Sequence, residues 1–91
     1  MHIDRLYWDD WNVDHIARHR VQPQEVGEVF ASRSKHIYRA WKGRYRVLGR
    51  TGVGRYLMIV FDYPSRGGAA YVVTARDMDD KERALYNRRT L

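Results

Sequence analysis

Two histidines four residues apart are the side chains of this sequence best suited to move protons. A helix would place His15 and His19 on one side, together with Asn12. An imidazole titrates near neutral pH, so either ring can act as a general acid or a general base. The alternative is that one histidine caps the end of the helix and the other is an exposed polar side chain. We expect no metal site, because Ile16 follows His15 where a metalloprotease motif has glutamate, and no third ligand has a suitable spacing.

Arginine supplies 14 of the 17 basic residues, and its planar guanidinium binds phosphate through two parallel hydrogen bonds. Arg44, Arg46 and Arg50 share one face of an expected strand, and Arg55 follows the next turn. We expect these four to bind RNA phosphates. Arg76 ends the last expected strand, where its guanidinium would reach a cleft. Solvated surface charge is the alternative for the first three, and an ion pair with Glu82 or Asp77 is the alternative for Arg76.

A carboxylate and a phenol near the end of the chain complete the candidates. Glu82 could be a general base held by Arg76 or Arg83, but it also completes an Asp79-x-x-Glu82 capping box, which explains it without catalysis. Tyr86, one helical turn later, could stack on a base or position a phosphate, although a core contact explains it equally well. Metal-free RNA cleavage needs a base for the 2′-hydroxyl, cations for the phosphate and an acid for the leaving 5′-oxygen. The candidate catalytic residues are His15, His19, Arg76, Glu82 and Tyr86.

The pattern of apolar residues predicts the elements that must position these groups. Leu6-Tyr7-Trp8 is expected to form a short strand or an entry segment. Asp9 or Asp10 caps a helix over residues 10–19, and Pro23 opens a second helix that contains Val26, Val29 and Phe30. A period of two then predicts strands at residues 35–41, 44–49, 56–63 and 69–76, separated by short glycine-containing turns. A closing helix runs to about residue 89. We therefore expect a small α+β domain over residues 1–91, with two N-terminal helices, a four-stranded antiparallel sheet and a C-terminal helix.

Composition excludes several classes of protein. With 44% hydrophobic residues the chain is too apolar to be disordered, and zero cysteines exclude disulfides, thiolate nucleophiles and Cys-type metal sites. The net charge of +6 is uneven, because residues 1–30 carry 3 basic and 6 acidic side chains whereas residues 31–91 carry 14 and 5. An arginine-rich basic region favours nucleic acid as the partner, with a coding bias toward arginine as the alternative. No stretch is long enough to span a membrane and no signal peptide is evident, so we expect a soluble cytoplasmic protein.

An ordered set of short motifs resembles the BrnT-like toxins of type II toxin–antitoxin systems. The matching segments run through nearly the whole chain: Trp8-Asp9, Asn12, His15, His19, Val21, Glu25-Val26, Glu28-Val29, Gly49-Arg50-Thr51, Gly54-Arg55-Tyr56-Leu57, Thr74-Ala75-Arg76-Asp77, Glu82-Arg83 and Tyr86. The sequence departs from the family pattern at Arg20, where a glycine usually follows the first helix. It also lacks the usual lysine one turn into that helix, where Trp11 and Asn12 stand.

The resemblance implies a RelE-like fold and a small ribonuclease that needs no metal or cofactor, with Arg76 in the active region. It also implies a cognate DNA-binding antitoxin from the adjacent gene, in a toxin–antitoxin hetero-oligomer, with a homodimer as another assembly. The expected function is cleavage of RNA by transesterification, which inhibits translation and growth. The alternative is a non-catalytic basic module that binds RNA or DNA. A third interpretation is a basic face that only docks an acidic protein.

Overall fold

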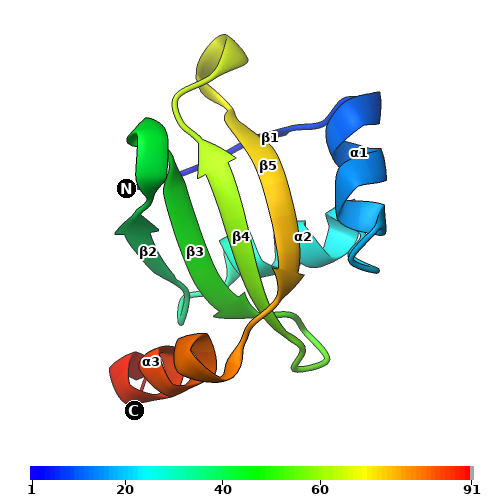
Figure 1. Cartoon of the computed structure of the whole chain (residues 1–91). Helices are drawn as coiled ribbons and strands as arrows, with labels where there is room; N and C mark the ends of the chain where they lie inside the picture. Colours follow the sequence, from blue (N-terminus) through cyan, green and yellow to red (C-terminus); the bar gives the residue numbers. More distant parts are fainter. Residues whose placement is uncertain (91) are drawn as a thin grey trace.

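The structure is a computed structural model that describes residues 1–90 (Figure 1). It is a small α+β arrangement of three α-helices and one five-stranded sheet. The elements in chain order are β1 (Leu6–Tyr7), α1 (Asp10–Ala17), α2 (Pro23–Ala31), β2 (His36–Arg39), β3 (Tyr45–Arg50), β4 (Tyr56–Asp62), β5 (Ala70–Asp77) and α3 (Asp80–Thr90), with short 3-10 turns at Trp41–Gly43 and Arg66–Gly68.

The strand order in the sheet is β1-β5-β4-β3-β2. The four strands expected from the sequence form an antiparallel meander, within one or two residues of the predicted bounds. The short N-terminal strand expected at residues 6–8 is present as β1, but the prediction of a four-stranded, purely antiparallel sheet is wrong, because β1 pairs with β5 in parallel and makes a fifth strand. A strand of two residues has too short a pattern to reveal its partner.

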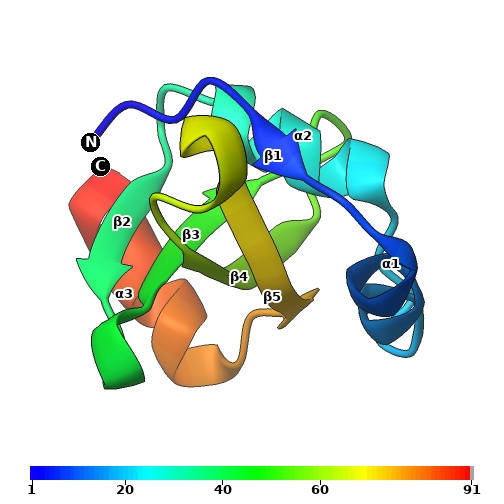
Figure 2. The ribbon, with the colours of Figure 1, turned by 90° about the horizontal axis from the view of Figure 1, so that it is seen from above.

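Two helices cover one face of the sheet and one helix covers part of the other (Figure 2). α1 and α2 bury the larger core, which includes Ile16, Phe30, Ile59 and Phe61 among its members. α3 lies across one end of the opposite face (Figure 1). There a smaller core contains Leu48, Met58, Val60, Met78 and Tyr86.

Local signals set the helix ends. Asp9 caps α1 in a reciprocal pair of hydrogen bonds with Asn12, and Pro23 is the first residue of α2. α1 ends at Ala17, two residues earlier than predicted, and Arg20 adopts the left-handed conformation with φ 60°. The amide of Arg20 donates to the carbonyl of Ala17 and that of Val21 donates to Ile16, which is the Schellman pattern. Arg20 therefore makes the turn for which glycine is usual.

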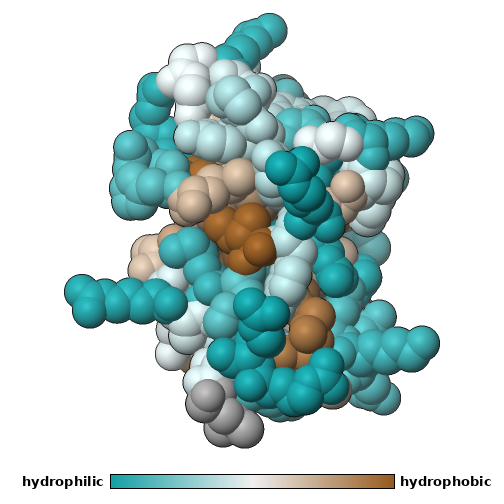
Figure 3. All heavy atoms as spheres, turned by 90° about the vertical axis from the view of Figure 1, so that its left-hand side faces the viewer, coloured by the Kyte–Doolittle hydropathy of each residue, from teal (hydrophilic) through white to brown (hydrophobic). Residues whose placement is uncertain are grey.

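β2 forms one edge of the sheet, and β1 forms the other. On the side of the molecule that carries the β2 edge, hydrophilic side chains project around small apolar areas (Figure 3). None of the helices within residues 1–90 is long and apolar enough to cross a membrane.

Candidate RNA-binding and catalytic site

Two arginines from different strands converge on one carboxylate where α3 meets the sheet. Arg76 binds Glu82 with both arms of its guanidinium, Nη1 to Oε1 at 2.8 Å and Nη2 to Oε2 at 3.0 Å. Nη1 of Arg46 lies 3.6 Å from Oε2 of the same carboxylate. The side chain of Glu82 is 9% exposed, whereas those of Arg46 and Arg76 are 31% and 38% exposed. We call these three residues the arginine–glutamate cluster.

The register of the sheet explains why the cluster forms. Arg46 and Leu48 alternate with the inward residue Val47 on β3, so Arg46 lies on the face that α3 covers. Arg76 of β5 is paired with Met58 of β4, which packs under α3 on the same face. Glu82 then enters from the first turn of α3.

Glu82 also serves as a helix cap. Its Oε1 accepts the amide of Asp79 at 2.9 Å, and the Asp79 side chain accepts the amide of Glu82 at 2.8 Å. The capping box predicted from the sequence is therefore present, and so is the ion pair with Arg76. Hydrogen bonding to Glu82 raises the pKa of the Arg76 guanidinium above its ordinary value, with burial acting in the opposite direction. One carboxylate thus fixes the start of α3 and orders two cations.

The other two arginines expected on this face have different surroundings. Arg44 precedes β3 and its Nε binds Oδ1 of Asp62 at 3.1 Å. Arg50 is exposed, and its guanidinium carbon lies 4.7 Å from the ring centroid of Tyr56. Arg46 and Arg50 lie on the same face of β3, whereas Arg44 precedes the strand, and the three guanidiniums do not converge on one point.

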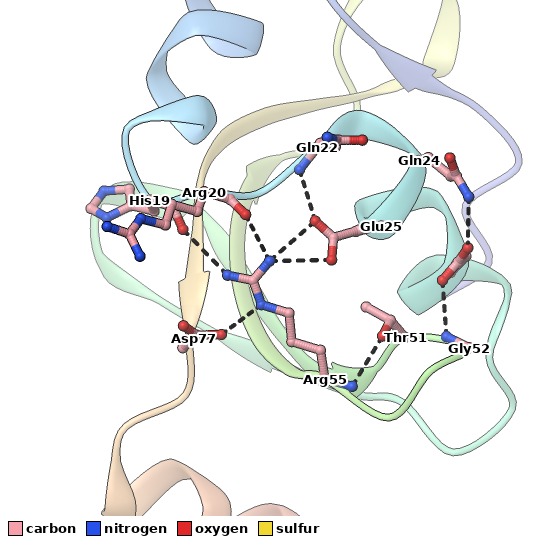
Figure 4. Close-up of polar contacts among 10 residues, drawn as sticks. His19, Arg20, Gln22, Gln24, Glu25, Thr51, Gly52, Arg55 and Asp77 are labelled. Carbon is pink, nitrogen blue, oxygen red and sulfur yellow. Dashed lines mark hydrogen bonds and ion pairs between the residues drawn. The ribbon is translucent and has the colours of Figure 1, made fainter.

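The Arg55 guanidinium donates hydrogen bonds to three segments of the chain: the turn after α1, the start of α2 and the end of β5 (Figure 4). Its Nε donates to Asp77 at 2.7 Å, and Nη1 donates to Glu25 at 3.1 and 3.2 Å. The main-chain oxygens of Arg20 and His19 accept from Nη1 at 2.7 Å and from Nη2 at 3.3 Å. Asp77 is the largest cause of a raised Arg55 pKa, and Arg55 in turn lowers the pKa of Asp77. A phosphate could reach Arg55 only by displacing these acceptors.

The two candidate histidines lie away from the arginine–glutamate cluster. His15 is half-buried on α1 and His19 is exposed just after it, and α1 packs on the sheet face opposite α3 (Figure 2). His15 stacks on exposed Trp11, with ring centroids 4.7 Å apart and planes 7° apart, and lies 6.0 Å from the ring of His19. The His19 side chain points away from the Arg55 guanidinium, which contacts only its main-chain oxygen (Figure 4). The structure therefore brings the histidines to each other but not to Arg46 or Arg76.

Tyr86 is in the small core and is 2% exposed. Its hydroxyl lies 3.1 Å from that of Ser34, and its ring meets the ring of Tyr56 edge-on at 5.7 Å. A buried ring cannot stack on an RNA base, so the structure places Tyr86 in the core contact that was the alternative to a functional role.

Two residues of this face were not among the candidates. Arg83 of α3 lies 4.2 Å from the centroid of Tyr56, on the ring that Arg50 also contacts. Tyr38 of β2 lies 5.3 Å below the Arg46 guanidinium, and its buried hydroxyl has no hydrogen-bond partner within residues 1–90. In the sequence, Arg83 was considered only as a possible partner for Glu82. Tyr38 fits the ordinary alternation of a strand, so nothing in the sequence indicated a role for it.

The arrangement can hold an anion and accept a proton. A surface hollow of about 280 Å³ is lined by Arg46, Asp79, Lys81, Glu82 and Leu85, so two cations and two carboxylates face the same space. Residues 1–90 contain no group of three or more side chains placed to bind a metal ion.

No protein-family model matches this sequence, and no curated protein matches it significantly.

Proposed function

We propose that this protein is the toxin of a type II toxin–antitoxin system, with a RelE-like fold of the BrnT type, and that it cleaves RNA without a metal. The observation that carries this proposal is the arginine–glutamate cluster, in which two partly exposed guanidiniums flank a carboxylate beside a surface hollow. Transesterification of RNA requires these groups, since the phosphate gains negative charge while the 2′-hydroxyl loses a proton.

The contacts suggest the role of each residue. A scissile phosphate in the hollow would draw Arg46 and Arg76 away from Glu82, because phosphate offers them the same bidentate geometry. The released carboxylate would then accept the proton of the 2′-hydroxyl as that oxygen attacks phosphorus. Lys81, which lines the same hollow, has a proton to give to the leaving 5′-oxygen. The products would be a 2′,3′-cyclic phosphate and a 5′-hydroxyl.

The cognate antitoxin would inhibit this reaction by covering the exposed arginines. In this proposal it is the product of the adjacent gene, and it also binds DNA. The net charge of +6 favours an acidic segment as the part that contacts the toxin.

A second candidate function, a non-catalytic RNA- or DNA-binding module, is favoured by the position of the histidines. Since His15 and His19 lie on the other side of the sheet, neither histidine can serve the cluster as a general base. Within the cluster, only Glu82 is proposed to accept the proton of the 2′-hydroxyl. If its contacts with Arg46 and Arg76 persist when RNA binds, the face would hold phosphate without cleaving it.

Incubation of the purified protein with RNA in EDTA separates the two functions. We expect the wild-type protein to produce fragments with 2′,3′-cyclic phosphate ends, whereas intact RNA that is bound in a salt-sensitive manner would support the module. Glu82→Gln is the sharpest variant, because glutamine at this position still supports a capping box but cannot take up the proton.

We expect Glu82→Gln to lose at least about 100-fold in cleavage rate, the usual contribution of a general base, and to keep its melting temperature within a few degrees. Arg76→Ala should also abolish cleavage, with a larger loss of stability because it leaves Glu82 without its main partner. Arg39→Gln, an exposed arginine at the end of β2, is the control for loss of charge. Undiminished cleavage by Glu82→Gln would exclude Glu82 as the base.

A further inference from the structure

Arg50 and Arg83 are drawn to one tyrosine ring rather than to a carboxylate. Their guanidinium carbons lie 4.7 and 4.2 Å from the centroid of Tyr56. Within residues 1–90, neither arginine has a carboxylate partner within 4.0 Å, although Arg46 and Arg76 share Glu82. Two like charges on one ring repel each other, and an anion beside both would relieve this repulsion.

The local structure holds both cations in place. The ring of Tyr56 meets that of buried Tyr86 edge-on, which fixes the surface on which the guanidiniums lie. Gly54 has φ +92°, and a Cβ there would be 2.7 Å from Nη2 of Arg50. The positive φ favours glycine at this position of the β3–β4 turn, and its missing side chain leaves room for the Arg50 guanidinium. An ordered cation loses less side-chain entropy when it binds a ligand.

A hollow of about 710 Å³ opens beside Arg50, between α3, the β3–β4 turn and the segment after α2. Its polar lining consists of hydroxyl and amide side chains, including Ser32, Ser34, Asn87 and Thr90. No acidic side chain in the described part of the chain lines it. Glu28 lies behind the turn, where its carboxylate accepts the amide of Gly52 at 2.9 Å. Hydroxyl and amide groups beside an arginine that has no carboxylate partner suit a ribose and its phosphate.

The position of this hollow separates it from the arginine–glutamate cluster. Arg46, Leu48 and Arg50 lie on the same face of β3, and α3 packs over Leu48 between the two arginines. Arg50 is four positions after Arg46 on β3, which corresponds to about 13 Å along the strand. A strand of RNA that occupied both places would pass over α3.

We propose that Arg50 and Arg83 form a second phosphate site, which binds the backbone of the RNA strand outside the arginine–glutamate cluster. Arg50 lines the acid-free hollow, whereas Arg83 reaches the shared Tyr56 ring from a neighbouring hollow of about 340 Å³ that also contains Asp77. The choice of RNA as the ligand rests on the proposed function, while the phosphate chemistry rests on the two cations that share one ring and on the hydroxyl-lined hollow beside Arg50. In this assignment the second site contributes affinity, and the cluster performs the cleavage.

The test uses a short fluorescent RNA with 2′-O-methyl riboses, which binds but cannot undergo transesterification. Its dissociation constant is measured by fluorescence anisotropy over a range of salt concentrations for the wild-type protein, Arg50→Gln, Arg83→Gln and the double variant. Arg39→Gln and Arg88→Gln are matched controls, since each removes the same charge from an exposed site. We expect each site variant to weaken binding about five-fold and to flatten the slope of log K against log salt by about 0.7.

The outcomes distinguish this inference from the proposed function. Salt slopes of the site variants equal to those of the controls would overturn the second site, whether or not the wild-type protein cleaves ordinary RNA. Flattened salt slopes, together with no cleavage of ordinary RNA in EDTA, would support the second site and exclude the proposed ribonuclease activity. Unchanged RNA affinity, with loss of binding to polyglutamate, would overturn the inference by assigning Arg50 and Arg83 to an acidic protein partner.

Discussion

Replacement of Arg55 by alanine should destabilise the protein more than loss of any other exposed or partly exposed arginine. Arg55 joins the turn after α1, the start of α2 and the end of β5 through its contacts with Glu25, Asp77 and two main-chain oxygens. Glu25 in turn accepts the amide of Gln22 at 3.0 Å, so the same carboxylate caps α2. Removal of the guanidinium affects all three segments together.

The size of the effect follows from the exposure of the groups involved. Asp77 is 66% exposed and would be rehydrated, so this pair contributes little, whereas the side chains of Arg55 and Glu25 are 25% and 24% exposed. A hydrogen bond to a charged group contributes about 1.5–3 kcal/mol, and the main-chain oxygens add a further contribution. We expect Arg55→Ala to lower the free energy of unfolding by about 2–3 kcal/mol. The melting temperature should fall by about 10–20 °C, because 1 kcal/mol shifts it by about 4–8 °C in a domain of this size.

Urea and thermal unfolding followed by circular dichroism would measure this loss. Arg44→Ala is the matched control, because Arg44 has a single ion pair, with Asp62. The side chains of Arg44 and Asp62 are 32% and 44% exposed. This substitution should cost less than about 1 kcal/mol. A loss for Arg55→Ala no larger than that for Arg44→Ala would refute the structural role of Arg55.

Three further predictions concern stability. Because Arg55 lowers the folded-state pKa of Asp77, the stability from this pair is present above the ordinary aspartate pKa and is lost as the pH falls through the lowered folded-state pKa; acid titration of unfolding should show that the difference in stability between wild type and Arg55→Ala narrows over this range without vanishing, since the contacts of Arg55 with main-chain oxygens remain, and a constant difference would contradict the pairing. Arg20→Gly should stabilise the protein by about 0.5–1 kcal/mol in urea unfolding, since φ 60° strains arginine but not glycine, and a loss of stability would contradict the turn geometry. Asn12→Ala should cost about 2–4 kcal/mol, because the fully buried amide of Asn12 donates to the carbonyls of Tyr7 and Val72; a melting temperature within 2 °C of wild type would exclude this role.

Local chemistry made much of the fold predictable. Asp9, Pro23 and the pair Asp79–Glu82 mark the helix starts because capping involves residues three apart. The alternation of Arg46 and Leu48 correctly identified the strand face shared with Arg50, because the strand period fixes it. These features depend on neighbours in the sequence, so no knowledge of the tertiary structure was required.

The contacts between distant segments could not be predicted in the same way. The pattern around Arg55 shows a turn, but its partners Glu25 and Asp77 come from a helix and a strand whose approach depends on packing. His19 and Arg76 were expected in one site because both are suited to RNA chemistry, yet His19 follows α1 on one face of the sheet, whereas the Arg76 side chain lies on the other face beside α3. Residue type indicates what a side chain can do, whereas the packing of helices decides which side chains meet.

The small core under α3 has a consequence for how the cluster could be controlled. Tyr86 is the one large side chain that α3 buries fully, while α1 and α2 share a much larger core on the far face. A fluctuation that lifts α3 would carry Glu82 away from Arg46 and Arg76 and leave the sheet intact. The proposed base can thus be withdrawn from its cations without global unfolding, by any partner that prefers the undocked helix.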